Sequence, residues 1–416
     1  MRTDADLIVA GGGPAGSVSA WLAAREGLKV ILVDPGRHRP RLEGLSPRLR
    51  HWLAGQGLLD GFRHIHGPLR RQVSWAGISE SNAEYVVERA ALDAHLRQMA
   101  QRAGARIVTG SARPEPGRVI LSEGDLAAPL VIDARGRKAG QGAHRAPATV
   151  ALSGWMRTAV SIPPGIRLVA FAGGWMWRVV LPDGRIWVQV MQDAAGKGTP
   201  AERLATALAE ADPGMAGTAR PEGCVIAREA APRLPRPVDD LRLLSVGDSF
   251  AAMDPLSGHG QFWAVSSALA VAAVRRTLAA RPGSQDMCRR FLNRRAGETS
   301  LHQARIGRDF LRAETRFARY PFWAARIGFP DDLPASPRVK GPRIAQDIVV
   351  ENGLLAERTV LVMPKAPNGI AWLGDIPAAE AWQVWRQGGE DGLEARWGPA
   401  ARGIARQLAG LGQPPR

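Results

Sequence analysis

The chain is poor in cysteine and in long apolar runs, and each shortage excludes a class of protein. Only two of its 416 residues are cysteine, Cys224 and Cys288, and their positions indicate neither a disulfide framework nor a zinc site. No run reaches ~18 uninterrupted apolar residues, and residues 1–10 do not have the form of a signal peptide. We therefore expect a cytoplasmic protein without a membrane span and without a bound metal.

Lysine is also scarce, although the chain is strongly basic. Lysine and arginine together number 55 against 39 acidic residues, a net charge of +16, and only five of the 55 are lysine. Thirteen arginines and four acids lie in residues 271–330, which places 13 − 4 = +9 in that segment. The cluster predicts a surface for an acidic protein or peptide, with a solvated helix face as the alternative. Nucleic acid is not expected, because no nucleic-acid-binding motif accompanies the charge.

Apolar residues are plentiful: they make up 45% of the chain, enough to fill two or three structural units. An apolar run at residues 6–10, a glycine-rich turn, a small-residue helix at 15–26 and a second run at 29–34 predict a strand-turn-helix-strand unit. A basic, loop-like region follows. A helix that ends near Gly104 and a buried strand at residues 131–133 are predicted after it.

The pattern changes at residue 148, where alternating apolar runs begin. Residues 148–231 predict an antiparallel sheet with a hairpin at Asp183-Gly184 and a helix at 201–210. The later predictions are a strand at 241–246 that returns to the first domain, helices at 260–280 and 285–320, strands at 345–350 and 358–362, and amphipathic segments at 378–385 and 399–408. The sequence thus predicts an α/β chain, α+β overall, with three domains at residues 1–147 plus 232–330, 148–231 and 331–416.

The glycine-rich turn reads Gly11-Gly12-Gly13-Pro14-Ala15-Gly16 and lies between the first predicted strand and helix. Gly11, Gly13 and Gly16 leave backbone amides and the positive end of a helix free to face a pyrophosphate. Asp34 ends the next strand, where its carboxylate is placed to accept hydrogen bonds from adenosine ribose hydroxyls. The alternative, a turn that binds nothing, accounts less well for the strand, the helix and the acid together.

A second segment much later in the chain supplies the other half of the apparent site. Gly247-Asp248 ends a predicted strand, where Asp248 is placed to accept a hydrogen bond from a ribityl hydroxyl. Asp254-Pro255 and Gly258-x-Gly260 then open a long helix, whose N-terminal amides are placed to stabilise negative charge. This pattern resembles the ribityl and isoalloxazine motif of the group A flavoprotein monooxygenases, and the two segments together resemble their FAD site.

Two shorter matches belong to the same resemblance. Arg89, with Asp93, resembles the family's arginine that contacts the pyrophosphate or ribityl region, and Asp133-Ala134-x-Gly136-Arg137 resembles its strand-end motif. The resemblance covers about residues 1–320 and extends to the flavin-dependent halogenases and geranylgeranyl reductases. It implies FAD as cofactor, a glutathione-reductase-type Rossmann-like domain with an inserted antiparallel substrate sheet, and a small C-terminal domain. Electrons would come from NAD(P)H or from reduced flavin made by a separate reductase.

Five residues are candidates for contact with the substrate or for catalysis. Trp175 and Trp177 resemble the halogenases' Trp-x-Trp stretch, although two aromatics at period two on one strand face also suit a sheet core. Glu43 and Arg48 lie in or beside a segment that resembles the same branch, and we expect them to border the substrate channel. His259 lies beside the predicted flavin-facing loop, where it is placed to act as an acid or base; a loop histidine without a role is the alternative.

The resemblance implies FAD-dependent hydroxylation of an aromatic substrate through a C4a-hydroperoxyflavin. Halogenation is disfavoured, because it needs a lysine in the first domain and none occurs between Lys29 and Lys138. The missing lysine, the arginine-rich segment and the C-terminal domain favour the maturation flavoproteins that hydroxylate a tryptophan in a partner polypeptide, such as the one serving quinohemoprotein amine dehydrogenase. The alternatives are a geranylgeranyl-type reductase and a flavin-bound assembly factor without turnover. The sequence indicates no oligomeric state.

Overall fold

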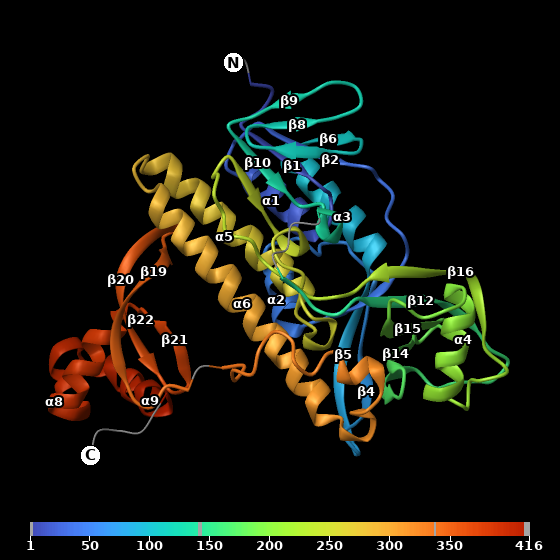
Figure 1. Cartoon of the computed structure of the whole chain (residues 1–416). Coiled ribbons are helices and arrows are strands. Elements are labelled where there is room, and N and C mark those ends of the chain that lie inside the picture. The colour runs from blue at the N-terminus through green and yellow to red at the C-terminus, as the bar shows by residue number, and fades with distance from the viewer. Residues whose placement is uncertain (1–2, 140–143, 337, 412–416) are drawn as a thin grey trace. The chain divides into compact units, whose positions relative to one another are not determined.

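The computed structural model describes residues 3–139, 144–336 and 338–411, and Figure 1 traces the chain. Its contacts divide it into two compact units, residues 1–272 with 292–333 and residues 273–291 with 334–416. Two long helices, α5 (Gly260–Ala280) and α6 (Gln285–Ala313), contribute residues to both units.

The first unit begins with a five-stranded parallel sheet in the order β18-β10-β1-β2-β6. Every residue of β1, β2 and β10 is buried, as is typical of a parallel sheet covered on both faces. Ile8 and Val131 pack with Val119 of a small three-stranded sheet, and α1 packs against α3. The bounds are β1 (Leu7–Ala10), β2 (Val30–Asp34), β6 (Arg106–Thr109), β7 (Arg113–Glu115), β8 (Arg118–Ile120), β9 (Leu126–Ala127), β10 (Leu130–Asp133), β18 (Leu243–Ser245), α1 (Pro14–Arg25) and α3 (Arg89–Arg102).

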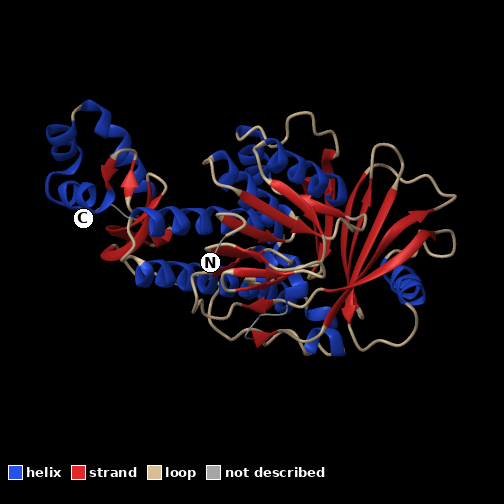
Figure 2. Ribbon diagram, turned by 90° about the horizontal axis from the view of Figure 1, so that it is seen from above, coloured by secondary structure: helices blue, strands red, loops and turns tan. Residues whose placement is uncertain are grey.

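The same unit contains an eight-stranded sheet in the order β16-β12-β15-β14-β13-β4-β5-β3, whose strands lie side by side in Figure 2. All pairs are antiparallel except β13 with β4. A two-stranded ribbon, β11 with β17, lies outside it. The bounds are β3 (Leu42–Leu45), β4 (Ile65–Trp75), β5 (Ile78–Glu88), β11 (His144–Arg145), β12 (Thr149–Arg157), β13 (Gly165–Phe171), β14 (Gly174–Val180), β15 (Ile186–Asp193), β16 (Arg220–Glu229), β17 (Arg233–Leu234), α2 (Pro47–Gly55), α4 (Pro200–Ala211) and α7 (Pro321–Ala324).

The large sheet is covered on both faces, as the alternation along β14 shows. Trp175 and Trp177 belong to one core, which also contains Trp323 from the segment after α6. Met176, between them, belongs to a second core, which contains Leu204 of α4. Helix α4 is fixed by a capping box, in which Thr199 and Glu202 each accept a hydrogen bond from the other's backbone amide. The sheet therefore presents one of its faces to α4 and the other to the segment that ends the first unit.

The second unit is a small α+β structure. Its three-stranded antiparallel sheet, β19-β20-β21, contributes Leu361 and Met363 to a core with Trp382 and Trp385 of α8 and Leu408 of α9. The bounds are β19 (Arg343–Glu351), β20 (Leu354–Met363), β21 (Ala366–Ile370), β22 (Trp372–Leu373), β23 (Ile376–Pro377), α8 (Ala378–Trp397) and α9 (Arg402–Leu411).

The predicted fold class is confirmed, while several predicted elements are wrong in extent. The loop expected between the second strand and the third helix contains α2 and strands β3, β4 and β5, and the last three belong to the large sheet. The second long helix, α6, ends at Ala313 instead of near Tyr320, because Glu314 caps a short 3-10 turn and Pro321 begins α7. Helix α8 continues well past Trp385, with a break in helical geometry at Gly389.

Within the described residues one helix, α5, is long and apolar enough to cross a membrane by length and composition. More than half of its apolar stretch is buried inside the protein, which is the behaviour of a core helix. The length of α5 is therefore weak evidence for a membrane span.

Candidate functional site

The glycine turn forms a close-packed corner between β1 and α1. A Cβ on Gly11 would overlap the Ala134 carbonyl, and one on Gly16 would overlap the Gly11 carbonyl. Gly13 differs, since a Cβ there would meet no atom within 4 Å. Pro14 starts α1 with the backbone angle that the first turn requires. The corner thus leaves open space beside the N-terminus of α1, where a phosphate group fits.

The Gly-Asp segment meets this corner, although more than half the chain separates the two. A Cβ on Gly247 would lie 3.0 Å from the Ala15 Cβ in α1 and 3.6 Å from Ala264 in α5. The Gly247 amide donates to the Ser267 Oγ at 2.8 Å, and the Trp263 Nε1 donates to the Gly247 carbonyl at 3.0 Å. Both halves of the predicted cofactor site therefore lie against each other, held by α5.

Asp34 lies at the end of β2 and is held by three donors. Its Oδ2 accepts from the Gly12 amide at 2.6 Å, and its Oδ1 accepts from the Gly36 amide and lies 2.8 Å from the His38 Nε2. Burial alone would raise the pKa of Asp34, but the hydrogen bonds from His38, Gly12 and Gly36 hold it below its ordinary value. The carboxylate is thus kept ionised beside the glycine turn, where the sequence predicts a ribose acceptor.

His38 joins Asp34 to a second carboxylate on α3. Its Nδ1 lies 3.2 Å from the Asp93 Oδ2, and the hydrogen bonds to Asp34 and Asp93 raise the pKa of His38 to about 9. The Arg97 guanidinium lies beside this imidazole and donates to the Gly12 carbonyl at 3.0 Å. Neither His38 nor Arg97 was predicted from the sequence. The spacing of 89, 93 and 97 on one helix face is the signal that would have found Arg97.

Arg89 is buried between two acids. It donates to the Asp93 Oδ1 at 3.0 Å and to the Glu43 Oε2 at 2.5 Å. Burial would raise the pKa of Glu43, but Arg89 and Arg41 hold it below its ordinary value. The predicted FAD contact Arg89 and the predicted substrate residue Glu43 are therefore one ion pair, which links α3 to strand β3.

The acids at the ends of β10 and β18 each have an arginine partner. Asp133 pairs with Arg135 at 2.8 Å, and Asp248 lies 3.2 Å from the Arg137 Nε. Arg233 lies next to them, fully buried: one nitrogen donates to the Arg137 and Asp248 carbonyls, while its Nε and Nη1 have no hydrogen-bond partner. Buried guanidinium N–H groups without an acceptor are costly. They suit a site that an anionic cofactor completes.

The start of α5 brings two further candidates together. The Arg48 guanidinium carbon lies 5.0 Å from the centre of the Phe262 ring. The centre of the His259 ring lies 4.8 Å from the centre of the same Phe262 ring. Burial, then the neighbouring His302 and Arg48, lower the pKa of His259, so the imidazole is neutral near pH 7. Gln261 ties this helix start to β3 by donating to the Gly44 carbonyl at 2.8 Å.

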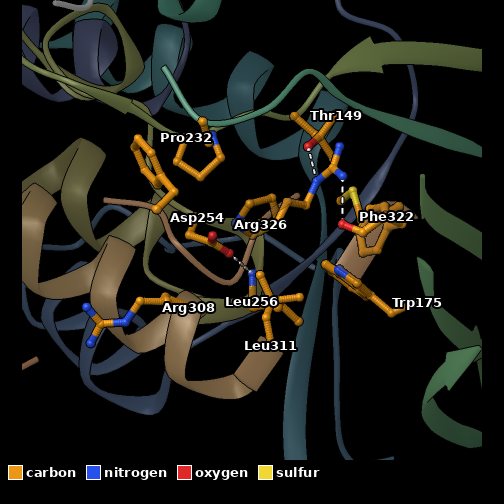
Figure 3. Close-up of a pocket in the computed structure, with 14 residues that line it drawn as sticks. Thr149, Trp175, Pro232, Asp254, Leu256, Arg308, Leu311, Phe322 and Arg326 are labelled. Carbon is orange, nitrogen blue, oxygen red and sulfur yellow. Dashed lines mark hydrogen bonds between the residues drawn. The ribbon is translucent and has the colours of Figure 1, made fainter. Parts of the chain in front are cut away.

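A pocket lies on the other side of the Asp-Pro segment, within the first unit (Figure 3). Of the five substrate and catalytic candidates only Trp175 lines it; Trp177 packs in the same sheet core. Its lining residues come from the sheet, the segments around 231 and 255, helix α6 and the segment after it: Ala146, Thr149, Trp175, Met191, Ala230, Pro232, Asp254, Pro255, Leu256, Arg308, Leu311, Phe322, Arg326 and Phe329. The C-terminal contributors were overlooked, because no motif marks them.

The arginine-rich segment is not a single solvated face, and the acidic-partner surface stays a prediction. Arg308 is 2% exposed and bonds to Asp309 and to the Asp331 and Leu333 carbonyls. Other arginines of the segment also pair within the protein, namely Arg290 with Asp286 and Glu357, Arg305 with Asp331, Arg312 with Asp332, Arg316 with Glu314, and Arg326 with Asp193. Asp331 and Asp332 lie directly after residues 271–330, so the net charge of +9 for that segment does not include these two partners.

The whole chain is similar to solved flavoprotein structures. It matches the peptidyl tryptophan dihydroxylase QhpG, essential for tryptophylquinone cofactor biogenesis, with a TM-score of 0.82 and 30% identity, over 99% of this chain and 100% of QhpG. It matches the myxobacterial chondrochloren halogenase CndH with a TM-score of 0.68 over 80% of this chain and 87% of CndH. At 23% identity the second likeness shows the fold alone.

Curated relatives are reductases. The menaquinone reductase of Mycolicibacterium smegmatis is 26% identical over 309 residues, 62% of this chain and 73% of that protein. That of Mycobacterium tuberculosis is 35% identical over 119 residues, so the match spans 26% of this chain and only 29% of the relative's length. No family model matches the chain.

Fold and relatives together define an FAD-dependent flavoprotein oxidoreductase, and the glycine corner, Asp34 and the two Arg233 nitrogens without an acceptor suit that cofactor. The chain belongs to the flavoprotein family that contains QhpG, in the same branch as the flavin-dependent halogenases and the menaquinone and geranylgeranyl reductases.

Proposed function

We propose that the protein is an FAD-dependent monooxygenase that hydroxylates an aromatic ring, specifically a tryptophan side chain in a partner polypeptide during quinone-cofactor biogenesis. The observation that carries the proposal is the match to QhpG along the full length of both chains. The absence of lysine between Lys29 and Lys138 supports hydroxylation over halogenation.

Each predicted cofactor residue has a proposed part in holding FAD. The backbone amides of Gly13, Ala15 and Gly16 at the N-terminus of α1 face the pyrophosphate, Gly11 and Pro14 shape the turn, and Asp34 accepts from the adenosine ribose. Asp248 accepts from the ribityl chain. Further proposed contacts are Arg89, Asp133, Gly247, Pro255, Gly258 and Gly260, together with the backbone of Asp254, whose side chain lines the pocket instead.

Bound FAD, once reduced by two electrons, supplies one atom of O₂ to the substrate carbon while the other atom leaves as water. The chain's own part is to orient the ring, exclude water and move protons. The amides that open α5 are placed to stabilise negative charge, and the neutral His259 lies beside them. The apolar walls around Trp175 shield a ring that fills the pocket from water.

Three further assignments belong to the proposal. Electrons come from NAD(P)H or from flavin reduced by a separate enzyme. The protein works in the cytoplasm, where Cys224, exposed and unpaired, stays reduced. The domains are residues 1–147 plus 232–330 for FAD, 148–231 for substrate, and 331–416 as an accessory domain. The partner is proposed to be acidic, which the net charge of +16 and the arginine-rich segment support.

A quinone or isoprenoid reductase is the second candidate, because menaquinone and geranylgeranyl reductases match the chain. The purified holoenzyme is reduced without oxygen and mixed in turn with menaquinone, geranylgeranyl diphosphate and oxygen, while flavin absorbance is followed. We expect oxygen alone to reoxidise the flavin within a turnover. Rapid anaerobic reoxidation by either isoprenoid would replace the monooxygenase with a reductase.

A further inference from the structure

The pocket behind the Asp-Pro segment is apolar and aromatic on almost every side. Trp175 and Met191 contribute from the large sheet, Leu311 from α6, and Phe322 and Phe329 from the segment that follows. Such walls accept a ring and offer it no hydrogen bond. Whatever enters the pocket must find its polar partners among the few remaining side chains.

The cationic side chains at the pocket have their donors directed elsewhere. Arg326 donates to the Thr149 hydroxyl at 3.0 Å, to the Phe322 and Ala148 carbonyls and to Asp193. In Figure 3 its guanidinium points to Thr149 and Phe322, and that of Arg308 points away from Asp254. An anionic ligand would therefore find no available guanidinium in the pocket.

The acidic side chain of the lining, Asp254, has one oxygen to spare among the described residues. Its Oδ1 accepts from the Leu256 amide at 2.8 Å, while no described residue donates to its Oδ2. A Cβ on Gly307 would lie 2.5 Å from that Oδ2, so glycine is required in α6 where it passes the carboxyl group. Burial raises the pKa of Asp254 to about 6, against the opposing charges of Arg137 and Arg326. Near pH 7 the group is thus mostly ionised and lacks a full set of donors.

The free space in the pocket is about 30 Å³, which admits water molecules but not a whole ring. Entry of a ring therefore requires lining side chains such as Leu256 and Leu311 to change rotamer. Side-chain changes of this kind are common when a ligand binds, even where the backbone stays fixed.

We propose that this pocket receives an uncharged aromatic group that carries an N–H or O–H donor, and that the donor bonds to the Oδ2 of Asp254. An indole ring fits that description, since it is apolar except for one N–H. The inference rests on the proposed function and deepens it, because it assigns the substrate-facing acceptor. A carboxylate at the indole N–H also makes the ring more electron-rich, which favours oxygen transfer to it.

The competing interpretation is that Asp254 only caps the short 3-10 turn at Pro255–Ser257. The Asp254→Asn variant separates the two roles. Asparagine keeps an oxygen for the Leu256 amide, so the cap survives, but it presents an NH₂ group where Oδ2 stood. A capping role predicts no change in ligand preference; the proposed role predicts its loss.

The test measures binding of indole and of N-methylindole to the FAD-loaded protein by calorimetry, without turnover. We expect the wild type to bind indole about 10- to 100-fold more tightly, because a hydrogen bond to a charged acceptor is worth roughly that much. Asp254→Asn should remove the preference, and Asp183→Asn, in the exposed β14–β15 hairpin, should keep it. The preference should also fade below about pH 6, where Asp254 is protonated while Arg137, Arg308 and Arg326 stay charged.

Equal affinity of the wild type for the two ligands, or no binding of either, overturns the inference whatever the variants do. A retained preference in Asp254→Asn overturns it as well. Failure of the proposed function gives a different result: the indole preference is present, but no polypeptide gains oxygen. The role of Asp254 and the proposed hydroxylation are thus tested separately with the same protein preparation.

Discussion

At the scale of single residues, the histidine between two carboxylates gives the protein a pH-dependent contact beside the glycine turn. His38 lies 2.8 Å from Asp34 and 3.2 Å from Asp93, and these hydrogen bonds raise its pKa to about 9 from an ordinary 6.5. A group whose folded pKa is raised contributes stability that is full below the unfolded pKa and is lost as pH rises through the folded one. The window is therefore about pH 6.5 to 9.

Replacing the imidazole tests this contact. We expect His38→Gln to lower the free energy of unfolding by about 2–3 kcal/mol at pH 6, and by much less at pH 10 where the wild-type histidine is neutral too. Urea unfolding of both proteins at the two pH values gives the difference, in which groups common to both cancel. A difference that does not change with pH would show that folding leaves the pKa of His38 unshifted, which would contradict the contact with the two carboxylates.

The positions of some residues could be predicted from the sequence, and the positions of others could not. Gly247 and Asp248 were placed beside the first glycine turn, because both motifs carry local requirements that can be read without a partner. The buried position of Arg308 could not be predicted. The sequence of an arginine-rich helix is the same whether an arginine faces solvent or pairs with an acid such as Asp331. Partner geometry, and not composition, decides that question.

At the scale of the element, the first turn of α1 offers a matched pair of glycines. Gly13 has an ordinary backbone conformation and open space beside it, whereas a Cβ on Gly16 would overlap the Gly11 carbonyl. Gly13→Ala should leave the apoprotein as stable as the wild type but weaken FAD binding at least about tenfold, because the methyl group takes space beside the helix N-terminus. Gly16→Ala should destabilise the apoprotein itself.

Thermal unfolding of the apoproteins and titration with FAD separate the two effects. Normal FAD affinity in Gly13→Ala would place the pyrophosphate somewhere other than the N-terminus of α1. Equal stability of Gly16→Ala and wild type would contradict the packing of the turn.

The elements that sequence missed share a physical cause. Strands β4 and β5 lie toward one edge of the large sheet, and few residues of β5 before Val86 are buried. A strand with little buried surface lacks the alternation on which a sequence prediction depends. Strands β12 to β15 of the 148–231 region are mostly buried on both faces, so their apolar residues identified them. The pocket was missed for a related reason: its walls meet only when β14, α6 and the chain after it have packed together.

At the scale of the whole molecule, the glycine motifs and the fold restrict the chemistry to that of FAD but leave two reaction classes. Oxygen transfer and isoprenoid or quinone reduction occur on the same architecture among the relatives. The substrate pocket must therefore decide between them. In the proposed substrate pocket, Asp254 has one oxygen to which no described residue donates. That oxygen favours a ring with a donor group over an isoprenoid chain, which has no donor for it.

The most direct measurement of the central claim is the mass of tryptophan-containing peptides after reaction with the holoenzyme. An extract from cells of the source organism that lack this gene is supplied with the protein, an electron source and oxygen-18 gas. We predict that tryptophan peptides of one polypeptide gain oxygen, about 16 Da per atom of ordinary oxygen and about 2 Da more with oxygen-18. Unlabelled product, or flavin turnover that leaves every tryptophan peptide unchanged, would contradict the account.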